Sequence, residues 1–264
     1  MGAPWAAPRP ADALVDPEYA RRYRELYERH WWWRAREHFV LEAVRCHLSP
    51  GGPRSILDVG CGDGLLFDRL AEFGEVQGVE SDPSLVGPAN PHRHRIHVGP
   101  FDASFVPGKH YSLILMLDVL EHLPDPADAL RRAVDLLAPD GLLVVTVPAF
   151  RLLWTTHDDL NHHFTRYTRH RFRVLARDAG IRVIRAAYFF HWLFPAKLAA
   201  RLGEAVLHPR PAPPRIPPSR VNEWLYRLSC LEQRLLTPLG LPFGSSLLVV
   251  GRRPTATAEA ARPS

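Results

Sequence analysis

The residues best suited to chemistry lie in and around a glycine-rich loop. Residues 56–64 have the sequence ILDVGCGDG, in which a short apolar segment runs into three glycines and carboxylates stand at Asp58 and Asp63. Glycine lets a backbone turn tightly and approach a ligand closely. A strand followed by such a loop and a helix places a ligand at the carboxyl edge of a parallel sheet.

The charge of this loop indicates which ligand it accepts. The pyrophosphate-binding fingerprint is G-x-G-x-x-G, but Leu65 stands where its third glycine would be, and the two aspartates would repel a pyrophosphate. Glu80, at the end of the next apolar segment, is placed to accept hydrogen bonds from two ribose hydroxyls. A positively charged nucleoside fits these residues, and S-adenosylmethionine, with its sulfonium and ammonium groups, is such a molecule.

A second group of polar residues follows a valine-rich apolar segment. His157, His162 and His163 share a loop with Asp158, which can orient an imidazole, and His122 stands earlier in the chain. Histidine suits general-base catalysis near neutral pH when the group to be modified is a hydroxyl or phenol. We expect His157, His163 and Asp158 to be catalytic, the alternative being histidines that only pack in the loop. Because no cysteine lies near and the spacing is uneven, we expect no metal site.

Arg166 and Tyr167, in the same loop, have two interpretations. They can clamp a carboxylate or a phosphate of an acceptor, because a guanidinium binds such groups through two donors. Alternatively, Arg166 pairs with Asp158 and holds the loop. The sequence leaves both interpretations open.

Apolar segments that alternate with helical patterns must position these residues. This alternation predicts an α/β fold with a mainly parallel sheet that is covered by helices on both faces. The histidine loop then lies at the same sheet edge as the glycine loop. The expected strands are 56–59, 76–80, 96–98, 111–117, 142–147, 181–187 and 246–250, and the expected helices follow the glycine loop to Phe73 and span 125–138, 168–180 and 220–236.

These patterns resemble a known family, the class I S-adenosylmethionine-dependent methyltransferases. The resemblance is specific from Ser55 to about Val147, because four segments occur in the order and spacing of the family. It implies a doubly wound, Rossmann-like sheet of seven mainly parallel strands in the order 3-2-1-4-5-7-6, with the last strand antiparallel. The four segments are residues 56–66, Val79-Glu80-Ser81-Asp82, Tyr111–Pro126 and Leu137–Pro148.

The resemblance also implies a set of cofactor-binding residues. One departure concerns the helix after the second strand, which Gly87-Pro88 and Pro91 interrupt, so we expect that side of the adenine pocket to be shortened. Arg36 is expected to form a surface ion pair, with the cofactor carboxylate as its alternative partner. The implied residues are Asp58, Gly60, Cys61 and Gly62 at the methionine half, Glu80 and Ser81 at the ribose, Phe101 and Asp102 at the adenine, and Leu117, Asp118 and His122 near the sulfonium.

The acceptor is described only in outline. Residues 118–123 (DVLEHL) resemble the small-molecule branch that includes the ubiquinone and menaquinone enzymes, which implies a small metabolite as acceptor, as in secondary metabolism. The resemblance places later segments over the acceptor, where aromatic walls favour an apolar or aromatic molecule. We expect transfer to oxygen, with carbon and nitrogen as alternatives. The expected acceptor-binding residues are Trp32, Phe150, Trp154, Arg166 and Tyr167.

The same reasoning predicts the organisation of the chain. Asp16 and Pro17 are expected to begin a helical region that is broken near Trp31-Trp32-Trp33 and folds over the cofactor. We expect a disordered N-terminus over 1–15, an N-terminal helical lid over 16–50, a Rossmann-like methyltransferase domain over 51–251 with a helical insert at 188–240, and a disordered tail over 252–264.

Composition limits the other function classes. The formal net charge is +5, but the arginines are scattered, so we expect no DNA partner and keep an RNA methyltransferase only as an alternative. A non-catalytic S-adenosylmethionine-binding protein and a nicotinamide dehydrogenase are further alternatives. Three distant cysteines, no secretory signal and no membrane-spanning run predict a cytoplasmic protein. Residues 189–207 could rest on a membrane surface, and the oligomeric state stays open.

Overall fold

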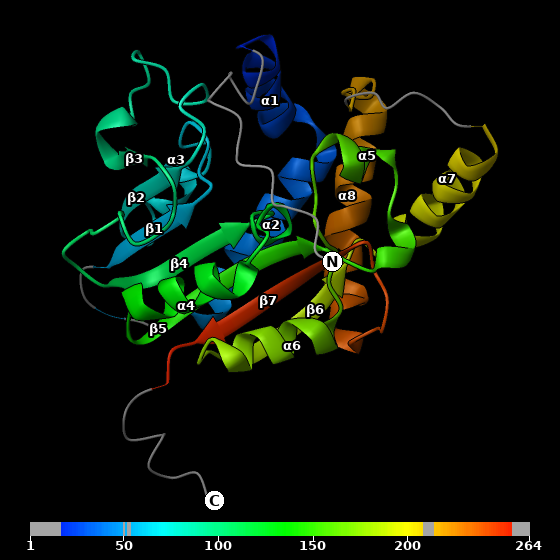
Figure 1. Cartoon of the computed structure of the whole chain (residues 1–264). Helices are drawn as coiled ribbons and strands as arrows, with labels where there is room; N and C mark the ends of the chain where they lie inside the picture. Colours follow the sequence, from blue (N-terminus) through cyan, green and yellow to red (C-terminus); the bar gives the residue numbers. More distant parts are fainter. Residues whose placement is uncertain (1–16, 50, 52–53, 208–213, 255–264) are drawn as a thin grey trace, which may run out of the picture.

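The computed structural model describes residues 17–49, 51, 54–207 and 214–254, with a seven-stranded sheet at its centre (Figure 1). The strand order is β3-β2-β1-β4-β5-β7-β6, and all neighbours are parallel except β7, which is antiparallel to β5 and β6. This confirms the predicted fold class, strand order and antiparallel last strand. The strands are β1 (Ser55–Val59), β2 (Glu75–Glu80), β3 (Ile96–Val98), β4 (Tyr111–Leu117), β5 (Leu137–Pro148), β6 (Arg182–Phe189) and β7 (Ser246–Arg252).

Helices cover both faces of the sheet because successive side chains of each strand point to opposite sides. Ile114 and Met116 of β4 join a buried apolar cluster with α4 (Pro126–Leu136) and α6 (Arg169–Asp178). Their neighbours Leu113 and Leu115 join a second cluster with α2 (Trp31–His47). The other helices are α1 (Pro17–Arg29), α3 (Phe67–Leu70), α5 (Thr156–Leu160), α7 (Leu193–Leu207) and α8 (Ser219–Leu235), with 3-10 turns η1 (Arg93–Arg95), η2 (Leu120–His122), η3 (Arg151–Leu153) and η4 (Thr237–Leu239).

The N-terminal helical region is broken at His30, next to the predicted tryptophans. The His30 ring accepts a hydrogen bond from Trp32 N at 3.1 Å and thereby caps α2. Asn222 of α8 holds the junction from outside: its amide nitrogen donates to Arg29 O at 2.7 Å, and its amide oxygen accepts from Trp31 N at 2.9 Å. The orphaned backbone groups at the break are therefore satisfied by a helix almost two hundred residues away in sequence.

Several boundaries differ from the sequence prediction. α3 ends at Leu70 instead of Phe73, and β7 continues to Arg252, which was expected to begin the tail. β5 begins at Leu137 because Leu137 pairs with Tyr111 of β4, and residues 139–141, expected to form a turn, lie in an irregularity between that pair and the pair Leu142–Leu113. Between β2 and β3 there is only the turn η1, as the prolines there predict. Asp16, residues 1–15 and most of the tail lie outside the described residues.

α7 and α8 both fall between β6 and β7, and α8 packs along α2. Arg34 of α2 donates to Glu223 at 3.2 Å, and its guanidinium lies 4.2 Å from the centre of the Tyr226 ring. Within the part of the chain that the structure describes, none of the helices combines the length and the apolar content needed to cross a bilayer.

Replacing Gly78 of β2 by alanine tests the packing under the glycine loop. An added Cβ would lie 2.8 Å from Phe67 Cζ and 3.0 Å from Cys61 Cβ, so we expect Gly78→Ala to lower the free energy of unfolding by about 1–3 kcal/mol. Gly87→Ala is the matched control, since nothing lies within 4 Å of a Cβ there. Urea unfolding measures both, and equal midpoints for the two variants would contradict the packing.

Candidate active site

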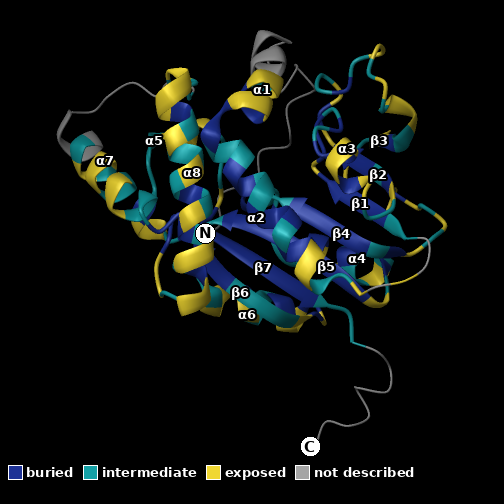
Figure 2. Cartoon of the chain, turned by 180° about the vertical axis from the view of Figure 1, so that it is seen from behind, coloured by how far each residue is buried: buried dark blue, intermediate teal, exposed yellow. Residues whose placement is uncertain are grey.

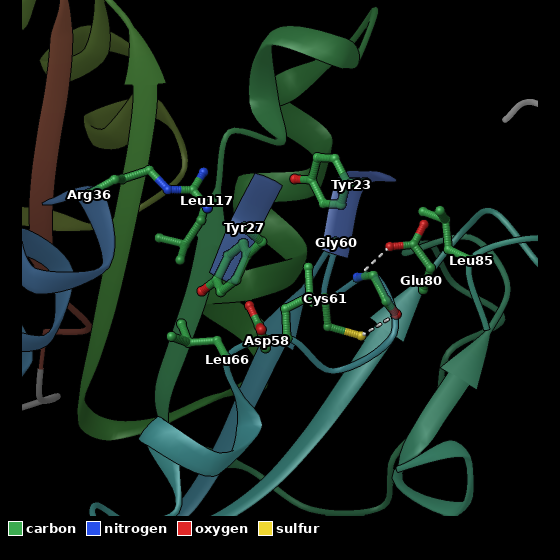
Figure 3. A pocket seen from close by; sticks show the side chains of 12 residues that line it. Tyr23, Tyr27, Arg36, Asp58, Gly60, Cys61, Leu66, Glu80, Leu85 and Leu117 are labelled. Atoms are coloured by element: carbon green, nitrogen blue, oxygen red, sulfur yellow. Dashed lines mark hydrogen bonds between the residues drawn. The ribbon is translucent and has the colours of Figure 1, made fainter. Parts of the chain in front are cut away.

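A cavity opens at the carboxyl ends of β1 and β2, beside the glycine loop. The space within it is about 510 Å³, a volume that includes open solvent. Its walls come from the sheet edge, the glycine loop and the N-terminal helices (Figure 3). The lining residues are Tyr23, Tyr27, Arg36, Asp58, Gly60, Cys61, Gly62, Leu65, Leu66, Glu80, Leu85 and Leu117.

The glycine loop is fastened to β2 and shapes the floor of the cavity. Gly60 N donates to Val79 O at 2.8 Å, and Gly60 has a φ of 73°, a conformation that favours glycine. Gly62 N donates to Glu80 Oε2 at 2.8 Å, the contact drawn in Figure 3, while Asp82 N donates to Glu80 Oε1 at 2.9 Å. The Glu80 carboxylate is therefore held at the cavity wall by two peptide N–H groups.

Two buried carboxyl groups give the cavity its charge. Burial raises the pKa of Asp58 to about 7, an effect that Arg36 opposes and Glu80 reinforces. Burial also raises the pKa of Glu80, against the hydrogen bonds from Asp82 and Gly62 that favour its ionised form. A cationic ligand in this cavity stabilises both carboxylates, whereas an anionic one has little to bind except Arg36.

Arg36 lies in the interior and not on the surface as the sequence led us to expect. Its side chain is buried at the end of the cavity, forms an ion pair with Asp118 just beyond β4, and lies 5.3 Å from the centre of the Trp32 ring. Asp118 also accepts a hydrogen bond from Thr146 Oγ1 at 3.2 Å and has a φ of 55°, a strained conformation for a non-glycine residue. The pair thus joins α2 to the carboxyl end of β4.

α1 closes the cavity with residues that the sequence did not single out. Tyr23 and Tyr27 lie one helical turn apart and both line the cavity (Figure 3). Arg24, between them, donates from Nε to Asp63 of the glycine loop at 2.8 Å. Two tyrosines at this spacing with a basic residue between them are a sequence signal, but it can be interpreted only once it is known that this helix meets the acidic glycine loop.

Three residues expected at the ribose and adenine end do not line the cavity. Ser81 is exposed, and Asp102 is exposed and accepts hydrogen bonds from Ser104. The Phe101 ring packs 6.1 Å from the Phe105 ring. Leu85, from the segment that lacks the usual helix, forms the wall on this side.

A second polar cluster lies in the loop after β5 and centres on Asp158. This carboxylate is fully buried, accepts from His163 Nδ1 at 2.8 Å, and accepts from Arg166 Nε and Nη2 at 2.8 Å each. Although burial acts in the opposite direction, the hydrogen bonds from His163 and Arg166 lower the pKa of Asp158. Of the two interpretations of Arg166, the structure thus shows the one in which it holds the loop.

Backbone contacts bring this cluster to the end of β4. Phe164 N donates to Glu121 O at 2.7 Å, and the Tyr167 hydroxyl, fully buried, donates to Leu120 O at 3.2 Å. The rings of His163 and His122 are therefore only 4.7 Å apart, edge to face. Tyr167 is part of this support, and its hydroxyl faces the protein interior.

Glu121 completes the cluster, although it was not among the expected residues. Its side chain is buried, burial and Asp118 raise its pKa well above the ordinary value, and none of the residues that the structure describes forms a hydrogen bond with its Oε2. Ligand atoms of Glu121, His122 and His163 lie within 4.8 Å of one another, the spacing of a metal site. Arg36 and Arg166 act on the same carboxyl, and their positive charges disfavour a cation there.

The remaining expected residues surround this cluster. His157 is exposed, with its ring 3.1 Å from the Asn161 amide, and Trp154 Nε1 donates to Asp159 at 2.9 Å. Phe150, with a φ of 55°, packs 4.7 Å from the Tyr188 ring, while Trp32 stacks on Phe190 at 5.7 Å.

Lys197 of α7 is a group that the sequence analysis did not place in the site. Burial, reinforced by Arg166, lowers its pKa to about 8, while Asp158 and Asp118 act in the opposite direction. Its position in a mainly apolar helix, whose other charged residues are Arg201 and Glu204, is the signal that could have found it, because a buried lysine is usually paired with a charged partner.

Comparisons with known proteins agree with this geometry. Residues 32–186, more than half of the chain, match the family model of a methyltransferase domain. Ubiquinone biosynthesis O-methyltransferase of Azorhizobium caulinodans is 30% identical over 167 residues, which cover 58% of this chain and 62% of that protein. The chain therefore spans less than two thirds of the length of this relative.

Solved structures show the same fold. The [4+2]-cyclase SpnF superposes with a TM-score of 0.55 at 17% identity, over 91% of this chain and 96% of that one. An S-adenosylmethionine-dependent methyltransferase from Archaeoglobus fulgidus superposes with a TM-score of 0.51 at 14% identity, over 82% and 94%. The matched range includes the glycine loop, Glu80 and the histidine cluster. The chain therefore belongs to the methyltransferase-domain family, which implies S-adenosylmethionine as its cofactor.

Proposed function

We propose that this chain transfers a methyl group from S-adenosylmethionine to a hydroxyl oxygen of a small, apolar or aromatic molecule. The observation that carries the proposal is the pair of buried carboxyls, Asp58 and Glu80, in a cavity beside the glycine loop. They suit a ligand with two cationic groups and a ribose. The name of the Azorhizobium relative, an O-methyltransferase of ubiquinone biosynthesis, supports oxygen as the atom and a small molecule as the acceptor.

The N-terminal helical region, residues 16–50, is proposed to cover the cofactor. Tyr23, Tyr27 and Arg36 of this region line the cavity, and Arg24 holds the glycine loop. When bound, S-adenosylmethionine supplies an activated methyl group, so the chain's own residues need only orient the acceptor, exclude water and take up a proton.

His163 is the proposed general base. Its Nδ1 is held by Asp158, which directs the N–H to that carboxylate and leaves Nε2 free to accept the hydroxyl proton of the acceptor. Asp158 is thereby a positioning residue, and Arg166 keeps it ionised. His157, on the exposed side of the same loop, is the second proposed base. Phe150, Trp154 and Trp32 are proposed as the apolar surroundings of the acceptor.

The affinity for S-adenosylmethionine should depend on pH through Asp58. With a pKa of about 7 in the free protein, this carboxyl is neutral in mild acid, whereas a cationic ligand favours its ionised form. Binding should therefore tighten about tenfold between pH 5.5 and pH 7 and then level off, with proton release near neutral pH. Isothermal titration calorimetry in buffers of different ionisation enthalpy measures both quantities.

Asp58→Asn supplies the control, because it should bind more weakly and with little pH dependence over this range. A wild-type protein that gives no binding heat with S-adenosylmethionine or its demethylated product would overturn the proposed function. A flat pH profile with normal affinity would overturn only the assignment of Asp58.

Glu80→Gln should weaken cofactor binding about tenfold to a hundredfold. The variant keeps the size of the side chain but loses the charge-assisted hydrogen bonds that a ribose would donate to the carboxylate. Glu75→Gln is the matched control at the exposed start of the same strand, where Lys109 pairs with it at 3.5 Å. Calorimetry measures the cofactor affinity of both variants. Equal affinities would show that Glu80 does not bind the ribose.

His163→Ala should lower kcat about a hundredfold with a phenolic acceptor while leaving cofactor affinity unchanged. Asp158→Asn should lower kcat less and shift the pH profile, because it alters the orientation and basicity of His163. Transfer of a labelled methyl group, with the product identified by mass spectrometry, measures the rate and the methylated atom.

His157→Ala separates the two histidines. If it alone slows transfer, His157 is the base. Full rates in all three variants would show that no base is needed, and cofactor binding without transfer to any acceptor would indicate a non-catalytic binding protein.

A further inference from the structure

The helix α8, which packs along α2, buries three polar residues and exposes four large apolar ones. The buried residues of α8 are Asn222, Ser229 and Glu232. In contrast, Val221, Trp224, Leu231 and Leu235 are 47%, 61%, 52% and 58% exposed. Figure 2 shows α8 in front of α2 with exposed residues along its length. A helix packed on a protein normally shows the opposite arrangement.

The exposed apolar residues form a single stripe. Positions 221, 224, 228, 231 and 235 follow one another at intervals of three and four residues, which places them on one side of an α-helix. Leu228, in the middle, is half-buried. We call this set the outer stripe of α8.

The inner face explains why α8 cannot turn to bury the outer stripe. Glu232 accepts hydrogen bonds from His191 N at 2.8 Å and Trp192 N at 3.1 Å. Asn222 bridges α1 and α2, and Ser229 Oγ accepts from the Trp192 indole at 3.3 Å. Rotation of the helix would leave these buried polar groups unpaired, which is costly. The hydrogen bonds of the inner face therefore keep the outer stripe directed away from the body of the protein.

A row of arginines borders the outer stripe on one side. Arg220, Arg227 and Arg234 recur every seven residues, and all three are exposed. Arg227 pairs with Glu223 on the same helix at 2.9 Å. Arg220 and Arg234 form no ion pair with any of the described residues. Positive charge next to exposed tryptophan and leucine is the pattern of a helix that lies in a membrane interface.

We propose that the outer stripe of α8, with its arginine row, binds the surface of an anionic lipid bilayer. The apolar side chains enter the boundary between headgroups and acyl chains, Trp224 lies at headgroup level, and the arginines contact lipid phosphates. A second copy of this chain fits the outer stripe less well. If two outer stripes packed antiparallel, their arginine rows would lie on the same side and repel each other. The proposal places the membrane contact on α8 and not on residues 189–207, which the sequence analysis kept as a possible membrane contact.

Flotation of the full-length chain with lipid vesicles tests this proposal without cofactor or acceptor. The vesicles consist of phosphatidylcholine alone or with one quarter phosphatidylglycerol. We expect binding to the anionic vesicles that weakens with added salt, and little binding to the neutral ones.

Two pairs of variants connect the binding to the residues. The double variant Trp224→Ser and Leu231→Ser should reduce partitioning about tenfold or more, and Arg220→Gln with Arg234→Gln should reduce it about tenfold. Val106→Ser, on another exposed apolar residue (79% exposed), and Arg173→Gln, on an exposed arginine of α6, should change nothing. Circular dichroism and cofactor affinity confirm that each variant is folded.

Each other outcome overturns the proposal. Wild-type protein that remains unbound at every lipid composition excludes a bilayer partner. Binding that the α8 variants leave intact assigns it to another surface. A dimer in sedimentation velocity that the Trp224/Leu231 variant dissolves, without vesicle binding, assigns the outer stripe to a second copy. All three results leave methyl transfer itself untouched, so they do not bear on the proposed function.

Discussion

Burial of several carboxyl groups at one edge of the sheet is the constraint on which the rest of the structure depends. Asp58, Glu80 and Glu121 lie at or just beyond the ends of β1, β2 and β4, where desolvation and neighbouring carboxylates raise their pKa values. Arg36 is the counter-charge, paired with Asp118 and acting on Asp58 and Glu121 as well. Because Arg36 comes from α2, the helix must lie on the sheet for the edge to keep its charge.

The histidine loop also buries a carboxylate, and a different arginine neutralises it. Asp158 is buried between His163 and Arg166, and Arg166 also donates to Ala149 O at 3.1 Å at the end of β5. Phe150 follows directly, with a positive φ and with its N–H donating to Tyr167 O. Strain at this residue is held by the contacts on either side, which is the usual condition for strain at a functional site. Each of the two polar clusters thus rests on one buried arginine.

The sequence predicted the parts of this arrangement that are local. Glycines at fixed spacing, a carboxylate at a strand end and alternating apolar segments were enough for the glycine loop, the place of Glu80 and a mainly parallel sheet, because each depends on neighbours within a few residues. The strand order is non-local and was implied by the family resemblance. Arg36, Tyr23 and Lys197 escaped or were misplaced because their partners come from other parts of the chain. The interior position of Arg36, for example, follows from how α2 packs against β4, and no periodicity encodes that.

Some of the predicted strand boundaries were wrong for a related reason. Pro139-Asp140-Gly141 has the composition of a turn and Asp140 does adopt a φ of 60°, but the segment lies inside β5 and the Asp140 carboxylate accepts from Arg252 of β7 at 2.9 Å. Pairing on both sides of this irregularity therefore continues the strand across a locally turn-like segment. The exposed Asp102 and Ser81 show the converse, since a family pattern carried them to a wall that this chain builds with Leu85 instead.

The Asn222 side chain connects α8 with the junction of α1 and α2. This side chain holds the peptide groups on both sides of His30, the point where the tyrosine-bearing and arginine-bearing helices meet. Because one side chain of α8 holds the peptide groups on both sides of the break, the placement of α8 and the placement of the two helices that roof the acidic pocket are fixed by the same pair of hydrogen bonds.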